Sequence, residues 1–70
     1  MELTDPIKAQ VINDIMENIS EMEKEQRIFD YLSKNTPIIS DRIRYKKQSK
    51  KIGTAITNWK FHLQAAKKLS

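Results

Sequence analysis

The sequence contains no cysteine, one glycine and two prolines among 70 residues, and each scarcity narrows the choice of structure. Without cysteine, disulfides and thiolate metal sites are excluded. A single histidine, His62, also excludes a histidine-rich zinc site. A chain this short buries little surface, so its stability must come from well-ordered packing or from association with another chain.

Long apolar runs and catalytic motifs are missing as well. No apolar run exceeds a few residues, so we expect no membrane-spanning segment. The stretch "MELTDPIK" lacks the basic and apolar parts of a secretory signal, and we expect a cytoplasmic protein. There is no glycine-rich phosphate loop, zinc-protease motif or nucleophile elbow. We expect a chain that is not an enzyme and that uses no cofactor.

Two sets of titratable residues could in principle support catalysis or metal binding. A catalytic histidine needs a partner that orients it, and the sequence around His62 signals none. His62 therefore does not predict catalysis. Four acids follow helical spacing in the first half of the chain: Asp14, Glu17, Glu21 and Glu25. We interpret them as the solvated face of a helix rather than as metal ligands.

The first half of the chain has the pattern of an amphipathic helix. The stretch "TDPIK" is a typical helix start, with Thr4 or Asp5 as a cap and Pro6 at the first helical position. Apolar residues then recur at alternating steps of three and four, with Gln26 filling one polar gap. This stripe comprises Ile12, Ile15, Ile19, Met22 and Phe29, and it predicts a helix over about residues 5–34.

The stretch "SKNTPIIS" at 33–40 predicts a turn over about residues 35–38. Asn35 is suited to end a helix in a left-handed conformation. Pro37 keeps Thr36 out of the helical region, and Thr36 then becomes a cap for a second helix over about residues 38–69. Ser40 and Asp41 are rival caps.

A second apolar stripe continues over three heptads, with steps of four and three. It comprises Tyr45, Ser49, Ile52, Ile56, Trp59, Leu63 and Ala66. Gly53 lies inside this stripe and costs about 1 kcal/mol relative to alanine. We interpret it as tolerated within one long helix; a three-helix chain with a break near Gly53 is the alternative.

These patterns predict an all-α fold, an antiparallel two-helix hairpin that forms one domain over residues 1–70. If the turn centres near residue 37, the numbers of facing residues add up to 74 or 75. Phe29 then lies opposite Tyr45, and Gln26 lies opposite Ser49, so the polar gap of each stripe faces the other. Such a polar pair penalises slipped registers.

Charge is divided unequally between the two predicted helices. Residues 2–34 hold eight acids and four bases, whereas residues 41–70 hold one acid and nine bases. The stretch "DRIRYKKQSKK" at 41–51 concentrates six of these bases. The register places Asp30 near Lys46, which predicts an exposed ion pair.

A row of cations along one rigid helix matches the demand of a phosphate backbone. We therefore expect DNA or RNA as a partner, bound without sequence preference. The alternatives are a basic docking face for a protein, or a solvated face that balances the acidic first helix. The candidate nucleic-acid-binding residues are Arg42, Arg44, Lys46, Lys47, Lys50, Lys51, Lys60, Lys67 and Lys68.

Several apolar residues fall outside the two stripes. Ile28, Tyr31 and Phe61 lie on outer sides of the helices and are candidates for binding a protein partner. Three isoleucines flank the turn, and we expect them to close the turn end or to dock another chain: Ile38, Ile39 and Ile43. A homodimer that forms a four-helix bundle is a further alternative.

The stretch "DRIRYKKQSKKIGTAITNWKFHLQAAKKL", together with "DPIKAQVI" earlier in the chain, resembles the small helical piece that accompanies the UvsW recombination helicases of T-even phages. The resemblance rests on general character rather than on a diagnostic motif. It implies an accessory or C-terminal module that helps an ATP-driven branch-migration helicase to hold branched nucleic acid in an infected host cell. The ATP-binding motifs of the helicase are not in this sequence.

Overall fold

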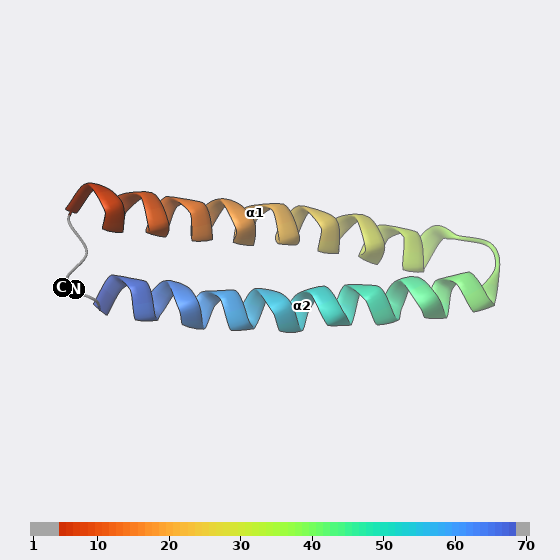
Figure 1. Ribbon diagram of the computed structural model, residues 1–70. Helices are drawn as coiled ribbons and strands as arrows, with labels where there is room; N and C mark the ends of the chain where they lie inside the picture. Colours follow the sequence, from red (N-terminus) through yellow and green to blue (C-terminus); the bar gives the residue numbers. More distant parts are fainter. Residues whose placement is uncertain (1–4, 69–70) are drawn as a thin grey trace.

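The computed structural model describes residues 5–68, which form two long helices. Helix α1 spans Asp5–Asn35 and helix α2 spans Ile39–Lys68. The two helices lie side by side and antiparallel, joined by residues 36–38 at one end (Figure 1). The molecule measures 52 × 15 × 12 Å. The predicted all-α hairpin is confirmed, and the two helix bounds at the turn lie within one residue of those expected. The expected cap Thr4 and the expected helix end at residue 69 lie outside the described residues.

The core lies along the seam between the helices and follows both predicted stripes. Its buried residues are Ile15, Ile19, Ile56 and Ala66, and half-buried Ile12, Met22, Ile52, Trp59 and Leu63 pack against them. The predicted register is confirmed near the turn, where the ring centroids of Phe29 and Tyr45 lie 6.0 Å apart. No side chain described in the structure is less than 2% exposed, so this core is thin.

The polar gap in the seam is closed by one hydrogen bond from a side chain to the backbone. Gln26 Nε2 donates to the backbone oxygen of Ser49 at 3.3 Å. The expected pair therefore meets, although the acceptor is the Ser49 carbonyl rather than its hydroxyl. This carbonyl belongs to the helical ladder of α2, so the amide of Gln26 adds a tie between the helices.

Helix α2 runs through Gly53 without a break, so the three-helix alternative is wrong. The structure also explains the glycine. A Cβ placed on Gly53 would lie 2.9 Å from Gln26 Nε2, closer than such atoms approach in real structures. The missing side chain leaves room for the Gln26 amide to reach Ser49.

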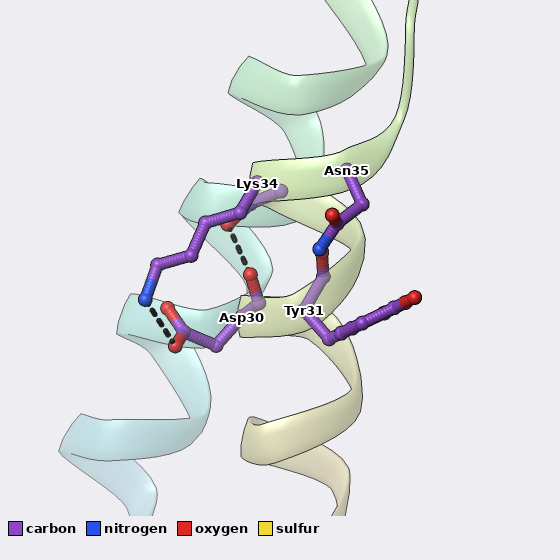
Figure 2. A network of polar contacts seen from close by, with 5 residues as sticks. Asp30, Tyr31, Lys34 and Asn35 are labelled. Atoms are coloured by element: carbon purple, nitrogen blue, oxygen red, sulfur yellow. Dashed lines mark hydrogen bonds and ion pairs between the residues drawn. The ribbon is translucent and has the colours of Figure 1, made fainter.

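The end of α1 is closed without a left-handed residue. No described residue has a positive φ, so the conformation expected for Asn35 is wrong. Asn35 stays in the helix, and its Nδ2 donates back to the Tyr31 carbonyl at 2.8 Å (Figure 2). Thr36 N extends the ladder by donating to Leu32 O at 3.0 Å. A backbone donor thus satisfies the Leu32 carbonyl, one of the last four of α1, and the Asn35 side chain adds a second contact one turn back.

The start of α2 differs from the capping prediction. The helix begins at Ile39, after the expected cap Thr36 and just before the rival caps Ser40 and Asp41. The carbonyl of Thr36, rather than its side chain, closes the turn, because it accepts a hydrogen bond from Arg42 Nε. Arg42 therefore fastens the first turn of α2 to the connection that precedes it.

The three isoleucines around the turn do not close it. Ile38, Ile39 and Ile43 are all more than half exposed and lie outside the core cluster. The expectation that they close the turn end is wrong, since two helices side by side provide no third surface to cover them; docking of another chain stays a prediction.

Candidate nucleic-acid interface

The nine candidate nucleic-acid-binding residues are all exposed along α2. An α-helix advances 100° per residue, so their positions around α2 follow from their distance from the seam residues. Four lysines lie on one flank of the seam, and two lie on the side of α2 opposite the seam. These six residues, which we call the lysine face, are Lys46, Lys50, Lys60 and Lys67 on the flank, and Lys47 and Lys68 on the opposite side.

The other three candidates do not belong to the lysine face. Arg44 and Lys51 share the opposite flank of α2. Arg44 forms an ion pair with Asp41, and Arg42 donates to the Thr36 carbonyl. Both arginines thus have partners inside the chain, whereas Lys51 lies apart from the lysine face without such a partner among the described residues. Binding of phosphate by any of the nine residues stays a prediction.

Lys46 is not held by the acid that the register placed near it. Asp30 instead forms an ion pair with Lys34 at 3.2 Å, one turn further along α1 (Figure 2). The predicted pair between Asp30 and Lys46 is therefore wrong. Residues four apart on one helix are neighbours on its surface, and such an ion pair contributes about 0.2–0.5 kcal/mol. Among residues 5–68, the ion pairs of the structure involve none of the six face lysines.

Arg27 adds a cation to the same side of the hairpin from the otherwise acidic helix α1. It lines an open pocket at the seam together with Gln26, Asp30 and Ser49. The register aligns Arg27 with residues 47–48 of α2, so it lies across the seam from the lysine face. Arg27 is missed from the sequence when only the net charge of each half of the chain is considered. The predicted register, applied to every basic residue of α1, would have placed Arg27 beside the lysine face.

The three candidate partner-binding residues are exposed but do not form one patch. Ile28 and Tyr31 lie near the turn, and the Tyr31 ring projects away from α2 (Figure 2). Phe61 is two-thirds exposed. The register aligns Phe61 with residues 13–14 of α1, about 20 Å along the hairpin from Ile28. Phe61 lies instead on the side of α2 that carries Lys47 and Lys68.

The remaining chemical features concern His62, the acidic residues and the hydropathy of the helices. The rings of Trp59 and His62 meet edge to face at 5.4 Å, so His62 packs on a neighbouring turn of its own helix. Within residues 5–68, no three histidines or acids lie close enough together to hold a metal ion. Neither α1 nor α2 has an apolar stretch long enough to cross a bilayer.

Comparison with known proteins gives no match: no family model, no curated protein and no solved structure matches the chain significantly.

Proposed function

We propose that this chain is a non-catalytic nucleic-acid-binding module that holds phosphate backbones on its lysine face without reading sequence. The observation that carries the proposal is the row of six exposed lysines on one rigid helix, none of which forms an ion pair in the described chain. Lysines that lack an acidic partner are free to neutralise phosphates and to release their counterions. Such contacts fix the position of the protein on the nucleic acid but do not distinguish between base sequences.

The dimensions of the lysine face suit a nucleic-acid strand. From Lys46 to Lys68 the helix rises about 33 Å, which is close to one turn of B-form DNA. Arg27 widens the face across the seam near its turn end. A rigid helix holds these charges in place, so binding orders only the lysine side chains.

Phe61 gives this face a second mode of contact. Its ring is two-thirds exposed, and it follows Lys60 directly in the chain. An exposed aromatic ring between cations is suited to stack on an unpaired base, with an energy of about 1–3 kcal/mol per base. This arrangement favours single-stranded or branched nucleic acid over a closed duplex.

The resemblance to the UvsW helicases supplies the biological setting of the proposal. In that setting the hairpin is an accessory or terminal part of a phage recombination helicase, and it holds one arm of a branched substrate while the helicase moves. Unwinding of a branched substrate by such a helicase, measured with and without added hairpin, tests this setting separately from nucleic-acid binding itself.

A mobility-shift titration with branched and single-stranded DNA tests the proposed function. We expect retention by the natural chain and its loss in the double variant Lys46→Glu/Lys50→Glu. The matched control is Lys8→Glu/Lys24→Glu, which changes the net charge equally on α1. Equal retention by the two folded variants would refute the lysine face.

A small protein-binding regulator is the second candidate function, because Ile28 and Tyr31 expose apolar surface on the outer side of α1. In that case the Tyr31→Ala variant loses a co-purifying partner, and the chain gives no DNA shift at low salt. A DNA shift that persists in Tyr31→Ala supports the first candidate instead.

A further inference from the structure

We propose that two copies of the hairpin pair face to face into a four-helix bundle, with both turns at the same end. The inference is independent of the proposed function, because it concerns the flank of the molecule that faces away from Lys46 and Lys50. Surface area, core composition and charge each support the pairing, and charge also selects its orientation.

The hairpin exposes more surface than a compact protein of its mass. Its accessible surface is 5693 Å². A globular monomer of 8.2 kDa has about 4500 Å². The difference of about 1200 Å² exceeds the roughly 800 Å² that each partner buries in a standard interface. An interface of standard size would therefore remove most of this excess surface.

The thin core of the hairpin also supports pairing. Folded domains pack at least two layers of secondary structure, and this hairpin is a single layer of two helices. Only four of its described residues are buried. A second hairpin laid on one flat side would supply the missing layer and would cover half-buried seam residues such as Ile12, Met22 and Ile52.

The flank of α1 that faces away from Lys46 repeats the spacing of the seam. Starting at Ile7, steps of four and three lead along α1 to Leu32. We call the surface that this stripe forms with its neighbours on α2, which include Lys51, Ala55 and Ala65, the pairing flank. Its α1 part is apolar at both ends and acidic in the middle, and its members include Ile7, Val11, Glu21, Glu25, Ile28 and Leu32.

The α2 part of the pairing flank mixes small, polar and charged residues, and its charge near mid-length is basic. Ala55 and Ala65 allow close approach of another helix, and Lys51 lies nearer the turn. In the register of the hairpin, Lys51 lies at the level of Glu21 and Glu25 of α1. The acidic middle of α1 and the basic part of α2 therefore occupy the same level along the molecule.

This charge pattern selects one of two symmetric arrangements. Pairing α1 with α1 of the second copy would bring like charges together, which costs free energy. Pairing α1 with α2 of the second copy brings Glu21 and Glu25 against Lys51. A two-fold axis parallel to the helices produces this second arrangement, and it places both turns at the same end.

Sedimentation equilibrium of the full chain, from low to high micromolar concentration, tests the pairing. We expect a mass of two chains that dissociates on dilution. Ile28→Asp on the pairing flank should raise the dissociation constant at least tenfold. The matched control is Ile43→Asp, which alters an isoleucine of equal exposure, 53% against 52%, on the other flank. A monomer throughout, a larger assembly, or an equal effect of both variants overturns the proposal.

Spin labels test the orientation, and the absence of cysteine makes labelling specific. Labels on Ser40→Cys lie at the turn, so we expect a distance well below half of the 52 Å length of the hairpin. Ser20→Cys, near mid-length, is the control and gives a similar distance in either arrangement. A distance near the full length for Ser40→Cys contradicts turns at the same end.

A charge reversal separates this inference from the proposed function. Glu21→Lys should weaken pairing about fivefold and leave the lysine face intact, so DNA retention persists. Adding Lys51→Glu should restore pairing, because the two charges are exchanged. If Glu21→Lys leaves the dissociation constant unchanged, the proposed contact is wrong, whatever the outcome for DNA.

Discussion

Gly53 and Gln26 act as one unit, and neither can be understood alone. Alanine at Gly53 gains about 1 kcal/mol of helix propensity. Its Cβ would also displace the Gln26 amide from the Ser49 carbonyl, at a cost of about 1 kcal/mol for the lost hydrogen bond. We expect Gly53→Ala to leave the free energy of unfolding nearly unchanged, as measured by urea denaturation.

The background variant Gln26→Ala separates the two contributions. With the amide removed, Gly53→Ala should stabilise the chain by about 1 kcal/mol. The difference between the two backgrounds is the coupling energy of the pair. If Gly53→Ala has the same effect in both backgrounds, the glycine is not there to accommodate Gln26.

Arg27 provides a second prediction at the scale of one residue. It lies across the seam from the lysine face, whereas Lys24 is exposed on the outer side of α1. Arg27→Glu and Lys24→Glu change the net charge equally. We expect Arg27→Glu to weaken DNA binding about tenfold in fluorescence anisotropy, and Lys24→Glu to weaken it much less. Equal losses would mean that only the total charge matters.

Sequence periodicity predicts most of what individual residues do in the seam. The stripes identify all four buried residues and bring Gln26 to Ser49. The role of Gly53 is not predictable, because it depends on where one amide nitrogen lies in three dimensions. The partners of Asp30 and Arg42 are missed for a related reason: exposed side chains have several partners of similar energy.

At the scale of the helices, the thin core makes each buried residue important. Ile56 is among the most buried residues of α2, at 6% exposed. Ile56→Ala should lower the free energy of unfolding by about 2–3 kcal/mol, toward the lower end for buried isoleucine because solvent is close. The exposed Ile43→Ala is the matched control and should change it by less than about 0.5 kcal/mol. Urea denaturation at one protein concentration compares them, and a similar small loss in both contradicts the assigned core.

Helix existence was more predictable than helix ends. Alternating steps of three and four specify two long helices and their register. The ends depend on local hydrogen bonds, and several residues of the turn offer comparable ones. Asn35 keeps a helical backbone, and its side-chain amide donates back to the Tyr31 carbonyl.

At the scale of the whole molecule, the two flanks of the hairpin differ in composition, and we propose that they serve different functions. One flank carries lysines without acidic partners in the described chain, and the other alternates apolar, acidic and small residues. Pairing through the second flank would leave two lysine faces on the outside of one bundle. A paired module would then hold two strands or two arms of a branched substrate at once, with a gain in affinity from its two sites.

The salt dependence of DNA binding tests the central claim, that the lysine face binds phosphates, most directly. Affinity for single-stranded and branched DNA is measured over a range of salt concentrations for the natural chain and for Lys46→Gln/Lys50→Gln. We predict that the logarithm of affinity falls linearly with the logarithm of salt, and that the variant has a slope shallower by about 2. An unchanged affinity and slope in the folded variant would contradict the account.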